Sequence, residues 1–138
     1  MMCRATRLRR DEGASAVEFA LISLLLFTIL FGIIQFGHIF FQWLEITHAA
    51  REGARWAALR NDEASTKTRV INAAPGLNPR LTAPQIVVDP PVTEGRTGQP
   101  VRVTVTYPTP LFAPIIGNLF GAGATTFNLV SSATQRIE

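Results

Sequence analysis

The stretch Phe19-Ala-Leu-Ile-Ser-Leu-Leu-Leu-Phe-Thr-Ile-Leu-Phe-Gly-Ile-Ile34 decides the fold of this chain. Residues 19–44 carry no formal charge. As a helix they would span about 39 Å, at about 1.5 Å per residue, and the hydrocarbon core of a bilayer is about 30 Å thick. We therefore predict one tilted membrane-spanning helix near the N-terminus, followed by a small domain.

Two other interpretations fit this stretch less well. A cleaved secretory signal peptide has an apolar region of about 7 to 15 residues, which is shorter than this one. The Ala-Ala pairs at 49–50 and 57–58, which could imitate its cleavage site, lie beyond the apolar run. A buried helix of a soluble protein would need cover on all sides, which about ninety other residues do not supply.

The charges on either side of the apolar run predict its orientation. Glu45 follows the run directly, and the next cation is Arg51, whereas four arginines precede it: Arg4, Arg7, Arg9 and Arg10. The positive-inside rule then places the N-terminus in the cytoplasm and the C-terminus outside it. Trp43 falls near the expected outer boundary, where indole rings tend to sit among headgroups, although it also fits as one more apolar helix residue.

Composition argues against nucleic-acid binding and against sites built from cysteines. The chain is basic, with a formal net charge of +3, but residues 1–13 carry +2 of it, and the remaining cations are scattered among eight carboxylates without an aromatic-interleaved basic stripe. We therefore expect no nucleic acid as a partner. Cys3 is the only cysteine, so an intrachain disulfide or a thiolate metal cluster is impossible, and no cofactor is expected.

The junction between the basic leader and the apolar run carries an unusual carboxylate. Glu18 stands at the edge of the run, where an ionised group is costly and generally has a partner or a purpose. Gly13 precedes it by five positions, and Phe19 follows it. An isolated glutamate at this position could also simply reach into the headgroup layer.

The whole arrangement resembles the type IV prepilin signal, in which a dedicated peptidase cuts after a glycine and leaves Glu and Phe as the fifth and sixth mature residues. The resemblance implies a prepilin peptidase as a partner and Gly13-Ala14 as the scissile bond. A glycine suits such a site because a peptidase needs an extended backbone without an obstructing side chain. Glu18 of one subunit could then pair with the new ammonium group of Ala14 on a neighbour.

A second block, Leu44-Glu-Ile-Thr-His-Ala-Ala-Arg-Glu-Gly-Ala-Arg-Trp-Ala-Ala-Leu59, is expected to continue the helix beyond the membrane. With the leader, it resembles the TadE-like minor pilins, or pseudopilins, of the tight-adherence (Tad) pilus, which carry an Ala-Ala-Arg-Glu-Gly-Ala-Arg-like stretch. The motif residues here are Thr47, His48, Arg51, Glu52 and Arg55. The resemblance is specific over residues 9–60, looser over 101–108 and 131–138, and absent over 61–100.

This resemblance implies a non-enzymatic role in assembly of a Tad-type pilus. The expected partners are other pilins and minor pilins, the inner-membrane pilus assembly platform and the lipid bilayer. The expected location is the bacterial inner membrane, as a single-pass protein, or the pilus itself. The alternative is an uncleaved membrane-tethered binding or accessory subunit that acts through its sheet and the apolar residues 111–120.

The second block also presents two rows of small side chains, which allow close helix contacts. Glycine in a helix costs about 1 kcal/mol against alanine, so Gly53 suggests a tight contact. That contact could be to the protein's own sheet or to neighbouring pilin helices. The rows are Ala49, Gly53 and Ala57, and Ala50, Ala54 and Ala58.

The charged face of the same helix offers little for catalysis. His48, Glu52 and Arg55 share a face, but a metal or general-base site would need further groups, and the only other histidine, His38, lies in the apolar run. A solvated or intersubunit ladder of ion pairs explains the face better. Its members would be Glu45, Arg51, Glu52 and Arg55.

The rest of the sequence predicts a small α+β domain. Residues 63–73 suggest a short helix that ends before Pro75-Gly76. Strands are expected over 85–89, 101–107 and 127–137, the last two with alternating inward positions. The fold class is thus α+β: a long N-terminal transmembrane helix continues into an extracytoplasmic helix that packs on about three antiparallel strands. The expected parts are a leader (1–13), a span (14–44) and a domain (45–138).

Overall fold

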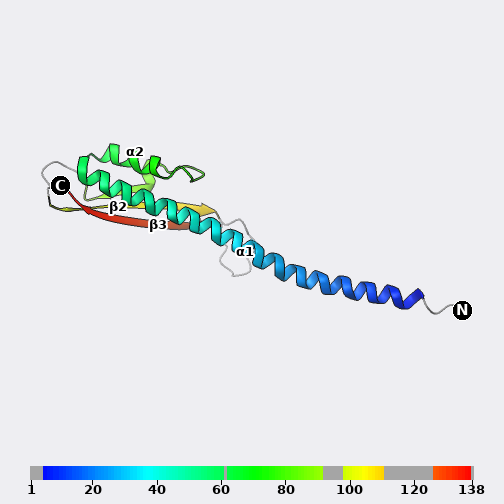
Figure 1. Ribbon diagram of the computed structural model, residues 1–138. Helices are drawn as coiled ribbons and strands as arrows, with labels where there is room; N and C mark the ends of the chain where they lie inside the picture. The colour runs from blue at the N-terminus through cyan, green and yellow to red at the C-terminus, as the bar shows by residue number, and fades with distance from the viewer. Residues whose placement is uncertain (1–4, 61, 92–97, 111–125, 138) are drawn as a thin grey trace. The chain divides into compact units, whose positions relative to one another are not determined.

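The structure is a computed structural model that describes residues 5–60, 62–91, 98–110 and 126–137, with the backbone alone for 5–12. Its contacts divide the chain into two compact units, Met1–Phe36 and Gly37–Glu138. The apolar residues 111–120 lie outside the described residues. The elements are drawn in Figure 1.

Helix α1 spans Ala5–Arg60 and therefore contributes to both units. Between Gly13 and Arg60 it is long and apolar enough to cross a membrane, and its most apolar window is not buried within the protein. Its apolar side chains before Gly37 are exposed, as lipid-facing residues would be; Phe19, Leu24 and Ile33 are examples. These features are consistent with a single-pass membrane anchor.

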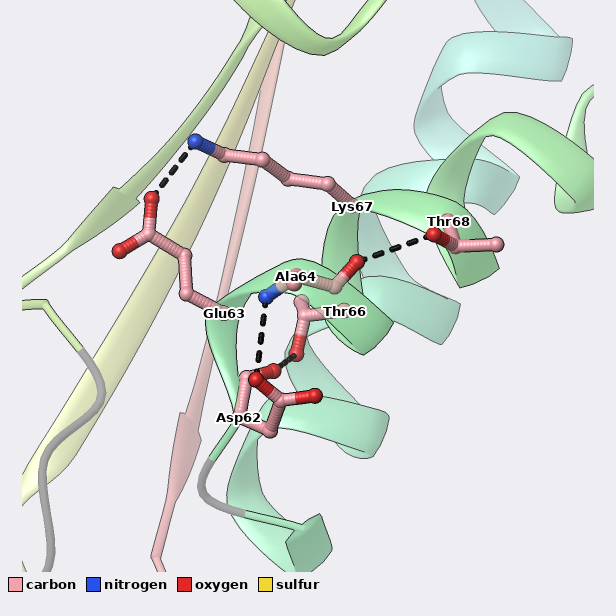
Figure 2. Close-up of polar contacts among 6 residues, drawn as sticks. All are labelled: Asp62, Glu63, Ala64, Thr66, Lys67 and Thr68. Carbon is pink, nitrogen blue, oxygen red and sulfur yellow. Dashed lines mark hydrogen bonds and ion pairs between the residues drawn. The ribbon is translucent and has the colours of Figure 1, made fainter.

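Helix α2 covers Glu63–Ala73, as the sequence predicts. Its N-cap is Asp62, whose carboxylate accepts a hydrogen bond from the backbone N–H of Ala64 at 3.2 Å (Figure 2). The same carboxylate accepts a second hydrogen bond from the backbone N–H of Ser65 at 3.0 Å. The Thr66 hydroxyl donates to the Asp62 carbonyl at 2.6 Å. These bonds satisfy donors that the first turn leaves free and fix where α2 starts.

The sheet has three antiparallel strands in the order β1-β2-β3. The short 3-10 helix η1 (Ala83–Gln85) leads into β1 (Ile86–Asp89), and β2 (Pro100–Pro110) and β3 (Thr126–Arg136) follow. The predicted alternation of β2 is confirmed, because its apolar residues Val101, Val103, Val105 and Tyr107 are all buried. The α+β fold predicted from the sequence is therefore confirmed.

The inward pattern predicted for β3 is only partly right. Leu129 is buried, and Ser131 and Ala133 are half-buried, but Phe127 and Gln135 are exposed. Alternation along a strand determines which face a residue occupies, but it does not determine whether another element covers that face at each end of the strand.

Within the second unit, the core lies between the sheet, α2 and the part of α1 after Gly37. Figure 1 shows α2 beside the C-terminal part of α1, and α2 also contacts β1 of the sheet. The Tyr107 hydroxyl donates a hydrogen bond to the Pro79 carbonyl (2.9 Å), which ties β2 to the loop that follows α2. The principal core side chains are Ile46, Val70, Ile86, Val103 and Tyr107.

Candidate functional site

The predicted processing segment lies in the exposed, helical first part of α1. Gly13, Ala14, Glu18 and Phe19 are all exposed, and an added β-carbon at Gly13 would meet nothing within 4 Å. Gly13 is helical, whereas a peptidase needs an extended backbone at its cut site. Local unwinding must then precede any cut there, and glycine, a poor helix former, lowers its cost by about 1 kcal/mol relative to alanine.

The small-residue rows of α1 pack inside the protein. Ala49, Ala50, Ala54 and Ala57 are fully buried in the core that α1 forms with α2 and the sheet. A β-carbon at Gly53 would overlap Cγ2 of Val70 in α2 and lie 3.3 Å from Cγ1 of Val103 in β2. Of the two contacts that the sequence allows, the rows thus make the one to the protein's own sheet and second helix.

Two motif residues tie α1 to its neighbours within the domain. The Ser131 hydroxyl of β3 donates to Oγ1 of Thr47 at 3.1 Å. Nδ1 of His48 lies 3.2 Å from the carbonyl oxygen of Ala73, the last residue of α2. Because a carbonyl only accepts, this contact requires a proton on Nδ1.

Glu52 is the motif residue with the strongest polar partner. Its Oε1 accepts hydrogen bonds from Nη2 (2.7 Å) and Nε (3.0 Å) of Arg69 in α2. These bonds, with the nearby charges of Arg69 and Arg55, hold the pKa of the Glu52 carboxyl below its ordinary value. The predicted ladder along α1 is wrong at this residue, because the partner of Glu52 lies on the second helix.

Glu45, the other carboxylate of the predicted ladder of ion pairs, also bonds to a residue outside α1. Its Oε2 accepts a hydrogen bond from the backbone N–H of Gly76 at 3.2 Å. A β-carbon at Gly76 would lie 2.7 Å from Cζ of Phe41 and 3.2 Å from Cδ of Glu45. A larger side chain at Gly76 would push the Phe41 ring or the Glu45 side chain aside.

Trp56, beside Glu52, forms cation–π contacts that were not predicted from the sequence. The guanidinium carbons of Arg60 and Arg69 lie 5.3 and 5.4 Å from the centre of a Trp56 ring, and the indole N–H donates to the Ser65 hydroxyl at 3.2 Å. Such cation–π contacts contribute about 0.5–1 kcal/mol each at exposed sites. The spacing of four between Glu52 and Trp56 places both on one face of α1 and could have indicated that α2 covers it.

Arg51 and Arg55 remain exposed on α1, and neither forms an ion pair within the described residues. Surface hollows flank Arg55: one of 390 Å³ is bounded by β3, and one of 160 Å³ by Arg69. Across the part of the chain that the structure describes, no three His, Cys, Asp or Glu side chains gather as metal ligands would. The motif therefore joins α1 to α2 and the sheet, and leaves two arginines at the surface.

The fold defines a protein with one candidate membrane helix and a small α+β domain built on the end of that helix. The family model described as TadE-like protein matches residues 13–55. The resemblance to the TadE-like family is therefore confirmed over these residues. No curated protein and no solved structure matches the chain.

Proposed function

We propose that this protein is a minor pilin or pseudopilin that takes part in assembly of a Tad-type pilus without catalysing a reaction. The observation that carries the proposal is the family match, which starts at Gly13 and runs through the Ala-Ala-Arg-Glu-Gly-Ala-Arg block. Membership of a pilus family implies contact with other pilus components. The exposed, apolar first part of α1 is the surface that such contacts would use in a membrane.

In this proposal a prepilin peptidase cuts between Gly13 and Ala14 on the cytoplasmic side of the inner membrane. The cut removes the arginines that hold the N-terminus in the cytoplasm and creates an ammonium group on Ala14. Glu18 lies on the exposed surface of α1. Its carboxylate would pair with the ammonium of a neighbouring subunit, so that neither charge stays alone near lipid.

Glu18 could serve recognition by the peptidase or pairing within the assembly. The variant Glu18→Gln separates these two roles, because it keeps the shape of the side chain and removes its charge. If pairing is its role, the protein is still cleaved, but its recovery with tagged Tad pilins falls severalfold at matched expression. Ser23→Ala, a change in the same helix that alters no charge, is the matched control. Equal recovery of Glu18→Gln and wild type would contradict the pairing.

The alternative, an uncleaved membrane-tethered accessory subunit, differs in one respect that can be measured. Its leader would stay intact in cells that contain the peptidase. The residues 111–120 through which it would act lie outside the described residues. Leader cleavage therefore distinguishes the two functions more directly than any feature of the domain.

A further inference from the structure

Two contacts show how β3 runs along α1. Ser131 of β3 bonds to Thr47 of α1, and further along both elements Gln135 and Arg136 line one surface hollow with Arg55 and Leu59. Within the second unit both elements thus advance in the same direction, as Figure 1 also shows. Four strand residues rise about 13 Å, the same rise as about nine helix residues. Gln135, four residues after Ser131, should therefore lie level with about residue 56 of α1, which agrees with its place beside Arg55 and Leu59.

The same ratio places the start of β3 beside the apolar run. Phe127 precedes Ser131 by four residues, so it lies level with about residue 38 of α1. Phe127 also pairs with Thr109 at the end of β2. The domain therefore extends down the helix to a level that the uncharged residues 19–44 still occupy.

Contacts within the second unit agree with this level. Gln42 is only 1% exposed, and its side-chain amide lies 2.9 Å from Nε2 of His38. Ile39 packs against the core. A helix face covered by protein in this way is not available to lipid, so part of the uncharged run belongs to the domain.

The remaining uncharged length still suits a bilayer. Residues 19–36, which end where the first compact unit ends, form about 27 Å of helix, close to the roughly 30 Å of the hydrocarbon core. The next residues, 37–44, would then lie in the headgroup layer. No charged residue occurs among residues 37–44 or 126–135.

Large apolar side chains are exposed at this level. Phe40 is 48% exposed, Trp43 43% and Phe127 55%, and the rings of Phe40 and Trp43 stack with centroids 6.2 Å apart. Trp and other aromatic rings favour the headgroup region, where an apolar body meets polar surroundings. These three side chains come from two elements distant in sequence, which a membrane surface would cover together.

We infer that the end of the domain formed by Phe40, Trp43 and Phe127 is seated in the outer headgroup layer of the bilayer, and that the hydrocarbon part of α1 ends near Phe36. The inference rests on the membrane anchoring in the proposed function. The partner of this surface is the lipid itself. This position in the headgroup layer sets how deeply the domain enters the membrane surface. It therefore also sets the distance of Arg51 and Arg55 from the membrane.

Quenching by brominated lipids tests this seating in the full-length protein. The protein is reconstituted into phosphatidylcholine–phosphatidylglycerol vesicles with bromine on the acyl chains close to the headgroups. Tryptophan is introduced at one position at a time, as Phe127→Trp or Val87→Trp, after both native tryptophans are replaced by phenylalanine. Val87 is a matched control, because it is also 55% exposed but lies level with Ser132, about 16 Å further along the sheet.

The inference predicts that tryptophan at 127 is quenched at least about threefold more than tryptophan at 87. Equal quenching at the two positions would overturn it. Native Trp43, measured in Trp56→Phe, should likewise be quenched more than native Trp56, measured in Trp43→Phe, so the result does not depend on the engineered sites. The readout needs neither leader cleavage nor pilus partners, so its failure is distinct from failure of the proposed function.

Discussion

Gly53 of α1 lies directly against Val70 of α2, with no room between them for a β-carbon. This contact brings the two helices together over Val103 of β2, near the end of the residues that the TadE-like family model matches. The glycine that costs helix stability is thus the residue that lets α2 pack on α1.

Gly53→Ala should destabilise the domain by up to about 2 kcal/mol, because overpacking costs about 1–3 kcal/mol and helix propensity returns roughly 1 kcal/mol of it. Chemical unfolding in detergent, followed by Trp56 fluorescence, measures the change. Gly37→Ala is the matched control, since a β-carbon there would meet nothing within 4 Å. The double variant Gly53→Ala, Val70→Ala should show favourable coupling, and strictly additive losses would contradict the close contact.

The ion pair of Glu52 with Arg69 predicts a pH dependence of stability. The pKa of Glu52 is lowered from its ordinary value of 4.5, so the pair stabilises the fold above that value and loses its effect as the pH falls through the lowered pKa. The pKa of Asp62 is lowered too, chiefly by hydrogen bonds from Ser65, so it acts in the same direction. Unfolding of wild type should therefore become easier below about pH 4.5.

Glu52→Gln should lower the free energy of unfolding at neutral pH by up to about 1 kcal/mol, as expected for a partly exposed pair, and should reduce the acid dependence. Glu63→Gln removes a carboxylate whose partner, Lys67, lies on the same helix, and should cost less. Denaturant titrations at neutral pH and at about pH 3 give both quantities. An acid dependence of Glu52→Gln equal to that of wild type would contradict the role of this pair.

The arginines before the apolar run, together with their absence directly after it, predict a cytoplasmic N-terminus. Alkaline phosphatase fused after Glu138 should be active, because this reporter folds only outside the cytoplasm. A cytoplasmic reporter at the same position should be inactive. The reverse pattern of activities would contradict both the pilin function and the tethered-subunit alternative.

Local sequence signals predicted most of the fold. The stop at Pro75-Gly76 predicted the end of α2, and strict alternation predicted the buried face of β2. Contacts between distant segments were not predictable in this way. The partner of Glu52 lies 17 residues further on, in another helix, and rules for neighbours on one helix point elsewhere.

The candidate site was predictable to a similar extent. The small-residue rows indicated a close contact but not its partner, which proved to be α2 and β2 of the same chain. Counting uncharged residues likewise gave a span of 14–44 but no sign that the side chain of Gln42 is buried. Charge and hydropathy along the chain indicate where lipid could be, but the tertiary fold determines which part of a helix the protein itself covers.

Processing at Gly13-Ala14 is the central claim, and the intact mass of the protein tests it most directly. The protein is isolated from its native membrane, from cells with and without the prepilin peptidase. The account predicts a mass that lacks residues 1–13 and begins at Ala14 when the peptidase is present, and the full-length mass when it is absent. Gly13→Ala should leave mostly the uncleaved form, because alanine stabilises the helix that must unwind and places a side chain at the cut. A full-length mass in cells that contain an active peptidase would contradict the account.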